Sequence, residues 1–312
     1  MLNVQKLVKI YPGPVTALQG LDLDVPTGMF GLLGPNGAGK STLMKILSGL
    51  LEPSSGSVTF DGIDVLKEPQ RMRAVLGYLP QDFGFYPNLS GEKMLKYLLR
   101  LKGVEAPGGE KKLIAELLER VNLTFAAKRK LKGYSGGMRQ RLGIAQAVAG
   151  DPKILIVDEP TAGLDPEERH RFYRILAELA SDRTVLLSTH IVEDVAVLCP
   201  RFAVISKGRL VANTTPSEAR SKLEGRIFEG AGSDDDLMML RERYRVTQAV
   251  LMEGRNRVRL SIPAGAEPPP GFDAVPATLE DVYMTLVSDK YEAGSDGSAP
   301  DTEAVAAVGV GS

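Results

Sequence analysis

The sequence predicts an α/β protein with a mostly parallel β-sheet covered by helices on both faces, followed by a small α+β domain. From Leu2 to about Lys207, short apolar runs such as "MFGLLG", "ILIVDE" and "TVLLST" alternate with longer amphipathic segments such as "EERHRFYRILAELA". Short runs that are apolar throughout are typical of strands buried on both faces, as in a parallel sheet between helices. The chain has 312 residues, 43% of them hydrophobic, which is enough for one large domain and a smaller one.

Charge and cysteine content narrow the classes of function. The 38 basic residues nearly balance the 39 acidic ones, so we expect no nucleic-acid partner, which usually requires a strongly basic surface. Cys199 is the single cysteine, which argues against a disulfide framework and a Cys/His metal site and favours a reducing cytoplasm. No stretch approaches the roughly 20 apolar residues that span a bilayer, so we expect any membrane crossing to come from a partner chain.

The first motif, "GPNGAGKST", predicts a phosphate-binding loop between a strand and a helix. Its glycines permit backbone angles that point successive N–H groups inward, and Lys40 adds a positive charge for the β- and γ-phosphates. Ser41 can then ligate Mg²⁺, and the positive start of the helix favours a polyphosphate. The alternative is a glycine-rich turn with a solvated lysine. The predicted ATP-binding residues of this loop are Gly34, Pro35, Asn36, Gly37, Ala38, Gly39, Lys40, Ser41 and Thr42.

The second motif, "ILIVDEP", is a buried strand that ends in two adjacent carboxylates. Neighbouring residues on a strand point to opposite faces, so the two acids are expected to do different work. We expect Asp158 to hold Mg²⁺ through water and Glu159 to polarise the water that attacks the γ-phosphate. Alone, such a pair is more often structural or a helix cap. The phosphate loop upstream makes the catalytic interpretation the better one.

The third motif, "TVLLSTH", ends a predicted strand at His190. An imidazole at the end of a strand is placed to hydrogen-bond the γ-phosphate and to orient the attacking water. A structural histidine is the alternative. The other histidine, His170, lies in a charged helical segment and is expected at the surface.

A fourth stretch, "YSGGMRQR", reads as a glycine bend that enters a helix, but no lysine follows its glycines. The phosphate loop, "YSGGMRQR" at 134–141, "ILIVDEP", "GLDP" at 163–166 and "STH" at 188–190 together resemble, in this order, the nucleotide-binding subunit of ABC transporters. The resemblance implies a P-loop NTPase cassette over residues 1–216, with an antiparallel β subdomain and a helical signature lobe at about 82–150. It also implies a head-to-tail dimer, expected to be a homodimer, with ATP between the subunits.

The resemblance assigns roles residue by residue. Gln81 in "YLPQDFG" would contact Mg²⁺ and link the site to the permease, and Tyr11 would stack on adenine, unless it is an ordinary aromatic at a strand end. The catalytic residues would be Glu159, His190 and Lys40, and the Mg²⁺ ligands Ser41, Gln81 and Asp158. Residues expected to act on the ATP of the partner subunit are Ser135, Gly136, Gly137 and Asp165.

The fourth stretch departs from the commonest signature of this family, Leu-Ser-Gly-Gly-Gln. Tyr134 replaces leucine and Met138 replaces glutamine. Methionine cannot donate hydrogen bonds as glutamine does, so a contact made by that glutamine in relatives is not expected here. The phosphate-facing residues of the motif are intact.

After about residue 207 the pattern changes to a smaller α+β unit, which we expect at 217–290. A helix is predicted at Asp235–Tyr244, and a hairpin is predicted for the runs Val246–Met252 and Arg257–Ile262, joined by "EGRN". The linker "PAGAEPPPGFDAVP" leads to Thr278, which is expected to form a capping box with Asp281. Residues 291–312 are rich in Gly, Ser, Ala and Asp, and we expect a disordered tail.

The function expected from these features is that of the ATPase subunit of a two-component exporter, bound to the cytoplasmic face of the membrane through a separate permease. "LEDVYMTLV" resembles the closing helix of an accessory domain in ATPase subunits of ABC-2-type exporters, which move drugs, antibiotics or sodium. Phe83, Phe85, Tyr86 and Leu89 form an apolar group that either receives the permease or packs the helical lobe.

Three alternatives stay open at this point. An importer subunit shares the same cassette. A soluble ATPase of DNA repair or translation commonly has two cassettes or a long coiled coil, and this chain has one cassette and no heptad run. A regulatory module that binds ATP without hydrolysing it is disfavoured, because the chain has the catalytic candidates Glu159 and His190.

Overall fold

The computed structural model describes residues 1–13 and 15–287, and its central element is a sheet with the strand order β10-β9-β3-β8-β7-β6. Strands β9, β3, β8, β7 and β6 run parallel, and β10 pairs antiparallel with β9 at one edge. The carboxyl ends of the parallel strands therefore share one edge of the sheet, as the apolar runs predicted. The bounds are β3 Gly28–Leu33, β6 Leu76–Leu79, β7 Ile154–Asp158, β8 Thr184–Thr189, β9 Arg201–Ser206 and β10 Arg209–Thr214.

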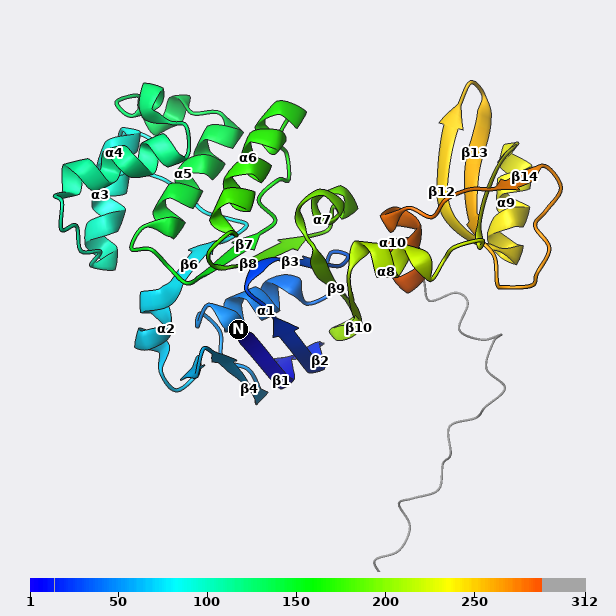
Figure 1. The fold of residues 1–312 in the computed structure, drawn as a ribbon, viewed down its shortest axis with the longest axis horizontal. Coiled ribbons are helices and arrows are strands. Elements are labelled where there is room, and N and C mark those ends of the chain that lie inside the picture. The colour runs from blue at the N-terminus through cyan, green and yellow to red at the C-terminus, as the bar shows by residue number, and fades with distance from the viewer. Residues whose placement is uncertain (14, 288–312) are drawn as a thin grey trace, which may run out of the picture.

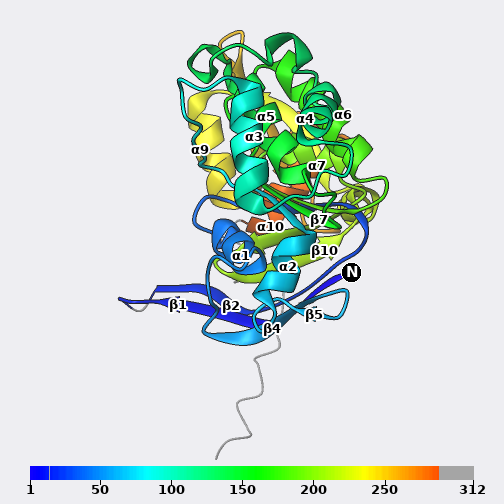
Figure 2. The same ribbon diagram turned by 90° about the vertical axis from the view of Figure 1, so that its left-hand side faces the viewer.

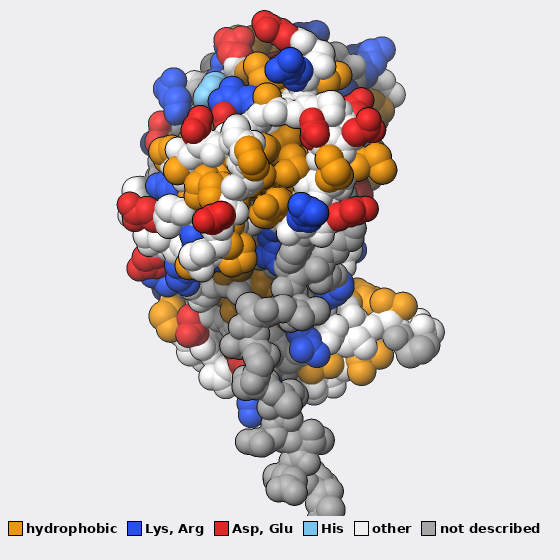
Figure 3. Space-filling model, turned by 90° about the vertical axis from the view of Figure 1, so that its right-hand side faces the viewer, with side chains coloured by type: hydrophobic (Ala, Val, Ile, Leu, Met, Phe, Trp, Pro, Cys, Tyr) orange, Lys and Arg blue, Asp and Glu red, His pale blue; other side chains and the backbone are white. Residues whose placement is uncertain are grey.

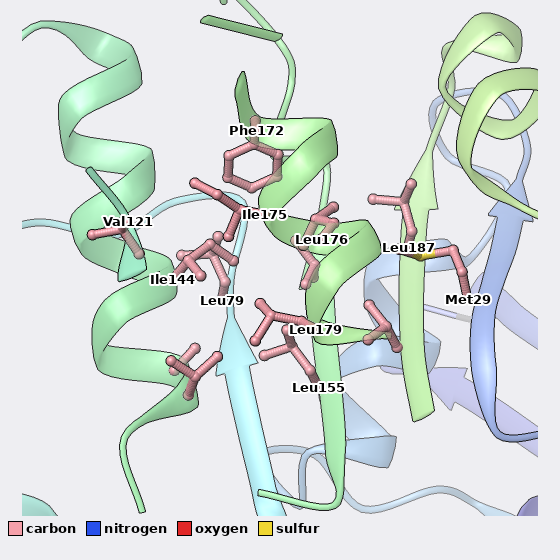
Figure 4. Close-up of a cluster of buried hydrophobic side chains, with 14 of the residues drawn as sticks. Met29, Leu79, Val121, Ile144, Leu155, Phe172, Ile175, Leu176, Leu179 and Leu187 are labelled. Atoms are coloured by element: carbon pink, nitrogen blue, oxygen red, sulfur yellow. The ribbon is translucent and has the colours of Figure 1, made fainter. Parts of the chain in front are cut away.

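Both faces of this sheet are buried because helices cover each side. Side chains alternate along the strands, so Leu155 and Leu187 enter one apolar cluster while Ile156 and Leu186 enter the other. On the first face, residues of α6 such as Phe172 lie over the strands, as Figure 4 shows. The covering helices are α5 Gly136–Val148, α6 Pro166–Leu179 and α7 Val192–Leu198, with α1 Lys40–Leu47 and α2 Pro69–Val75 on the opposite side.

A second, antiparallel sheet lies beyond α1 and has the order β2-β1-β4-β5. Figure 2 shows the resulting layers, with the helices α3 to α6 at the top, α1 and α2 below them, and this sheet at the bottom. The strands are β1 Leu2–Tyr11, β2 Val15–Val25, β4 Ser55–Phe60 and β5 Ile63–Asp64. This is the antiparallel β subdomain that the resemblance implied.

The helical lobe lies on the side of the central sheet away from the antiparallel sheet (Figure 1). It comprises α3 Gly91–Lys102, α4 Glu110–Arg120, the amino-terminal part of α5, and short 3-10 turns at Thr124–Ala126 and Leu131–Gly133. Its apolar residues belong to the same hydrophobic cluster as the side chains on the face of the central sheet that α5 and α6 cover. The start of α5 is therefore fixed to the sheet through one continuous core.

The carboxyl-terminal unit has a four-stranded antiparallel sheet of order β12-β13-β11-β14, with α9 against it. The predicted helix and hairpin are confirmed as α9 and as β12 paired with β13. The linker was expected to lack structure, but it contains β14, which pairs with β11. The bounds are α8 Pro216–Ser221, β11 Ile227–Gly232, α9 Asp234–Arg243, β12 Arg245–Met252, β13 Arg255–Ser261, β14 Phe272–Ala274 and α10 Leu279–Val287.

Helix α10 ties this unit to the rest of the chain. Its predicted capping box is present, because the Thr278 amide donates to Asp281 Oδ2 at 2.8 Å and the Asp281 amide donates to Thr278 Oγ1 at 3.1 Å. Asp281 also accepts hydrogen bonds from Arg259 and Thr247 of the small sheet. Leu279 of α10 belongs to the same apolar cluster as the central sheet.

One face of the carboxyl-terminal unit carries hydrophobic side chains at the surface (Figure 3). In α9 and β12, the exposed large apolar residues are Met238, Met239, Val250, Leu251 and Met252. Among residues 1–13 and 15–287, no helix has both the length and the apolar character needed to cross a membrane. The tail predicted at 291–312 lies outside the described residues.

Candidate active site

The candidate site lies where the central strands end. The phosphate loop follows β3, Gln81 follows β6, Glu159 follows β7, and His190 follows β8. Since these parallel strands point the same way, the four loops emerge at one edge of the sheet. The structure thereby brings together residues that are up to about 160 positions apart in the sequence.

The phosphate loop is held from behind by packed backbone. A Cβ atom at Gly34 would lie 2.4 Å from the carbonyl oxygen of Ile205, and one at Gly39 would lie 2.6 Å from that of Ala17. Gly39 also has φ of 107°, a conformation that only glycine adopts at little cost. The Gly208 amide donates to the Ala38 carbonyl at 2.9 Å. These glycines are therefore required both by backbone angles and by space.

The loop opens α1 at Lys40, as its motif predicts. Asn36 and Gly37 are exposed at the tip, Pro35 is half-buried, and Ala38 is buried. Ser41 and Thr42 occupy the first turn of α1 and are partly accessible. The first N–H groups of an α-helix have no partner within the helix, so an anion is favoured at the start of α1.

Lys40 is buried, with a side chain only 4% exposed, and its ammonium has three oxygen neighbours. It donates to the carbonyl oxygens of Gly34 at 2.8 Å and Pro35 at 3.2 Å. Its third neighbour is Oε1 of Glu159, at 3.2 Å. The lysine and the carboxylate that the sequence placed in different motifs thus form one buried ion pair.

Glu159 is the most connected of the predicted catalytic residues. Its Oε2 lies 3.1 Å from His190 Nδ1 and accepts a longer hydrogen bond, at 3.4 Å, from Gln81 Nε2. Its backbone has φ of 48° and its amide donates to the Ser188 carbonyl at 2.9 Å. A positive φ is strained for a side chain such as glutamate and is often found at functional sites. This conformation turns the carboxylate out of the strand direction towards its partners.

Asp158, the last residue of β7, is 2% exposed, and its Oδ1 has no hydrogen-bond partner among the described residues. Burial raises the pKa of this carboxyl group, against the opposite effect of the nearby hydroxyls of Ser188 and Ser41. A buried oxygen without a partner, with a serine hydroxyl beside it, fits a Mg²⁺ site made of oxygen ligands. Within the described chain, no group of three or more His, Cys, Asp or Glu residues has the geometry of a metal site.

Ser188 is a residue of the site to which the sequence assigned no role. It is fully buried beside Asp158 in the register of β7 and β8, and its Oγ has no partner among the described residues. The sequence feature that could have identified Ser188 as a site residue is its position in the "STH" stretch, two residues before His190.

Tyr11 lies at the end of β1, on the antiparallel sheet. Its hydroxyl is 3.3 Å from Thr42 Oγ1, and the ammonium of Lys9 lies 5.4 Å from the centre of its ring. The ring is therefore beside the first turn of α1.

Two of the residues predicted to act in trans are helix caps. Ser135 and Asp165 cap α5 and α6, accepting the amides of Met138 at 3.1 Å and Glu168 at 2.8 Å, and both are exposed. Among the described residues, no hydrogen bond or ion pair joins either of them to Lys40, Glu159 or His190.

The two glycines of the signature have different surroundings. Gly136 is exposed and a Cβ atom there would meet nothing within 4 Å. Gly137 is buried, and its Cβ would lie 2.2 Å from Glu168 Oε2. Glu168 pairs in turn with the buried Arg141. Gly137 therefore allows α5 and α6 to approach closely, while Gly136 leaves the helix start open to a ligand.

The two departures from the family signature are both buried. Tyr134 is 3% exposed and donates its hydroxyl to the Ala126 carbonyl at 2.8 Å. The hydroxyl occupies space that Gly91 leaves, since a Cβ at Gly91 would lie 2.2 Å from it. Met138 is 7% exposed and joins the apolar cluster of the lobe. Both substitutions therefore change the packing behind the signature rather than its exposed surface.

Comparisons with known proteins point to one family. The model of the ABC transporter family matches residues 18–162. The chain is 37% identical over 227 residues to the linearmycin resistance ATP-binding protein of Bacillus subtilis, with 72% of each chain covered. It is 35% identical over 295 residues to the Nod factor export ATP-binding protein I of Cupriavidus pinatubonensis, covering 92% of this chain and 90% of the relative.

A solved structure shares the fold. It is an ATP-binding cassette in a dimeric, post-hydrolysis state bound to ADP and Pi. The TM-score is 0.63 at 26% identity, with 69% of this chain and 98% of that chain covered.

Proposed function

Because the chain belongs to the ATP-binding proteins of the ABC transporter family, we propose that it works as an ATP-dependent dimer that drives export through a separate membrane permease. Binding and hydrolysis of ATP to ADP and phosphate is the activity of this cassette. The proposal adds the dimer, the permease and the direction of transport. Its site of action is the inner face of the cell membrane.

The observation that carries the dimer is the exposed start of α5, which offers its first N–H groups and a serine hydroxyl to an anion. Among the described residues, no hydrogen bond or ion pair joins Ser135 or Asp165 to Lys40 or Glu159. A second copy placed head to tail brings the start of α5 onto the phosphates held by the first copy. A structural neighbour solved as a dimer with ADP and Pi supports this arrangement.

Export is supported by the names of the relatives and by how far the similarity extends. The similarity to the Nod factor export protein runs over 92% of this chain, which includes much of the carboxyl-terminal unit. The daunorubicin/doxorubicin resistance ATP-binding protein of Streptomyces peucetius is 40% identical over 229 residues, covering 73% of this chain and 69% of that protein. We propose that the permease selects the transported compound, a small molecule, drug, lipid or ion, and the names of these relatives favour a drug or another small molecule.

Each residue of the cluster has a distinct part in hydrolysis. The loop amides and Lys40 bind the β- and γ-phosphates, and Tyr11 stacks on the adenine. Glu159 accepts a proton from the attacking water, and His190, 3.1 Å from Glu159 Oε2, orients the carboxylate and the water. Ser41, Gln81 and Asp158 would hold Mg²⁺, which when bound supplies positive charge beside the phosphate oxygens.

The ion pair of Lys40 and Glu159 links binding to catalysis. A γ-phosphate that reaches Lys40 competes with Glu159 for the same ammonium, because both are anions and Lys40 is buried. Glu159 then keeps its hydrogen bonds to His190 and Gln81 and is available as a base. Substrate binding thereby releases the catalytic carboxylate.

The permease is proposed to dock beside Gln81. A cavity of about 410 Å³ there is lined by Gln81, Phe83 and Phe85 on one side and by Gly136 and Arg139 of α5 on the other. Phe83 and Phe85 pack edge to face, with ring centroids 5.2 Å apart, and Tyr86 beside them is 57% exposed. The cavity lies between the loop of Gln81 and the start of α5. A permease helix inserted there would contact both Gln81 and the start of α5.

Site-specific photo-crosslinking in cells tests the docking site. A photoreactive phenylalanine at Tyr86 is expected to crosslink to an integral membrane protein, whereas one at Leu50, 68% exposed at the end of α1, is expected not to. Transport of a dye or drug in inverted vesicles that contain the crosslinked partner then gives the direction, with accumulation inside indicating export. A chain that crosslinks to no membrane protein at Tyr86 would contradict the permease proposal, and loss of vesicle contents would indicate import.

A further inference from the structure

A buried carboxylate that has no part in the proposed mechanism lies directly behind it. Asp194, in the first turn of α7, is 0% exposed. Its Oδ2 accepts hydrogen bonds from Thr161 Oγ1 at 2.5 Å and Thr189 Oγ1 at 2.9 Å, and its Oδ1 accepts one from the Tyr173 hydroxyl at 2.5 Å. Among the described residues, Asp194 forms no ion pair. Its two oxygens therefore bind three hydroxyl groups.

Each hydroxyl belongs to a different part of the catalytic region. Thr161 lies two residues after Glu159, in the loop that leads to Asp165. Thr189 directly precedes His190, and its Oγ1 also accepts the amide of Ile191 at 2.9 Å. Tyr173 lies on α6, the helix that Asp165 caps. One carboxylate thus joins the loop after β7, the end of β8 and α6.

These hydrogen bonds are strong constraints because the acceptor is a carboxyl group shielded from water. A buried polar group that loses its hydrogen-bond partner is left unsatisfied, at a free-energy cost to the folded state. Thr161 and Thr189 are as buried as Asp194, at 0% and 1% exposed. Burial and the nearby Asp194 carboxylate raise the pKa of Tyr173 well above its usual value, so its hydroxyl remains a donor. Water cannot replace any of the three donors without opening the core.

We propose that Asp194 is a positioning residue that fixes Glu159 and His190 relative to each other by clamping the loops that carry them. The inference rests on the proposed roles of Glu159 and His190 in hydrolysis. The direct contact between these two side chains is a single one of 3.1 Å, and the His190 side chain is 40% exposed. The clamp supplies the rigidity that this contact lacks. It also connects both residues to the loop of Asp165, which is proposed to face the partner subunit.

The test is steady-state ATPase kinetics of Asp194→Asn in the full chain. Asparagine keeps the size of the side chain but turns one acceptor oxygen into a donor facing hydroxyls. We expect kcat to fall roughly 10- to 100-fold, the scale for a small misplacement of catalytic groups. KM for ATP should stay within about twofold, since among the described residues no hydrogen bond or ion pair joins Asp194 to the phosphate loop. Glu193→Gln is the matched control, because Glu193 is next to Asp194 on α7 but has a side chain that is 68% exposed, and this variant should retain wild-type kcat.

A double mutant separates positioning from general destabilisation. In a Glu159→Gln background, Asp194→Asn should lower the residual turnover no further than about twofold, because the residue it positions is already disabled. A wild-type kcat for Asp194→Asn, or a rise in KM that accounts for the whole loss, would overturn the inference. If Asp194→Asn does not fold, Tyr173→Phe decides: reduced kcat at unchanged KM supports the clamp, and unchanged kcat rejects it.

The same set of proteins distinguishes this inference from the function on which it rests. Full turnover by Glu159→Gln alone would reject the catalytic role of Glu159. An inactive Glu159→Gln together with a fully active Asp194→Asn would reject only the clamp.

Discussion

The ammonium of Lys40 lies 3.2 Å from Oε1 of Glu159, and both side chains are almost fully buried. Two motifs more than a hundred residues apart in the sequence therefore meet in one ion pair at the edge of the central sheet. Because β8 lies between β3 and β7, the lysine reaches across the end of that strand to the carboxylate. This relationship gives the first prediction.

Glu159→Gln should bind ATP but hydrolyse it 10²- to 10⁴-fold more slowly, the range for loss of a general base. The neutral amide cannot accept the proton from water, yet it no longer competes with phosphate for Lys40. We therefore expect a dimer that persists with ATP and Mg²⁺, measured by light scattering after gel filtration. Glu116→Gln, an exposed charge on α4, is the control and should remain monomeric after turnover. Steady-state activity equal to wild type would rule out Glu159 as the base.

The trans arrangement predicts complementation between two inactive variants. Lys40→Ala should lose ATP binding to its own phosphate loop, and Ser135→Arg should block the start of α5. A mixed dimer has one site in which both faces are intact, so an equimolar mixture should recover ATP-dependent association. Pull-down of an untagged subunit by a tagged one, with and without ATP, measures this. If the mixture associates no better than either variant alone, the dimer is not built this way.

Asp158 should make the fold less stable at neutral pH than an uncharged residue would. Burial raises its pKa in the folded chain, so the folded state binds the proton more tightly than the unfolded state. The resulting destabilisation is absent below the unfolded pKa of about 4 and is complete above the folded pKa. We expect Asp158→Asn to raise the free energy of unfolding at pH 7 by roughly 1 kcal/mol and therefore to unfold at a higher temperature. The same variant should lose Mg²⁺-dependent ATPase activity.

Thermal melts without nucleotide between pH 4 and pH 7 check the sign. The advantage of Asp158→Asn should shrink as the pH falls. An advantage that is equal at both ends of this range would mean that charge burial is not its cause.

Tyr134 and Gly91 should behave as a coupled pair. Gly91→Ala places a Cβ 2.2 Å from the Tyr134 hydroxyl, and overpacking of this kind typically costs about 1–3 kcal/mol. Tyr134→Leu removes the hydroxyl, so Gly91→Ala should cost less in that background. Urea unfolding of the four proteins gives the coupling energy. Additive effects would show that the hydroxyl does not fill the space beside Gly91.

The sequence was most informative where chemistry restricts the residue type. A phosphate loop needs glycine at fixed positions, so "GPNGAGKST" predicted both the loop and the helix after it, and Gly34 and Gly39 are indeed confined by backbone contacts. Uniformly apolar runs predicted the parallel strands for a similar reason, because a strand between two helical layers has no wet face.

Features that depend on strand order could not be predicted. The pairing of Lys40 with Glu159 follows from the order of β3, β8 and β7, which local patterns do not contain. Asp194 reads as an ordinary acid in the first turn of a helix, where solvated carboxylates are common, and only its surroundings show that it is buried. Strand β14 was missed because its segment is rich in proline and glycine, which normally indicate a linker.

The contacts behind the phosphate loop have a thermodynamic consequence. Because Ala17, Ile205 and Gly208 hold the loop backbone in place, little conformational entropy remains for a nucleotide to remove. More of the free energy of binding ATP is therefore available for the proposed association of two subunits. A loop that had to be ordered first would consume part of that free energy.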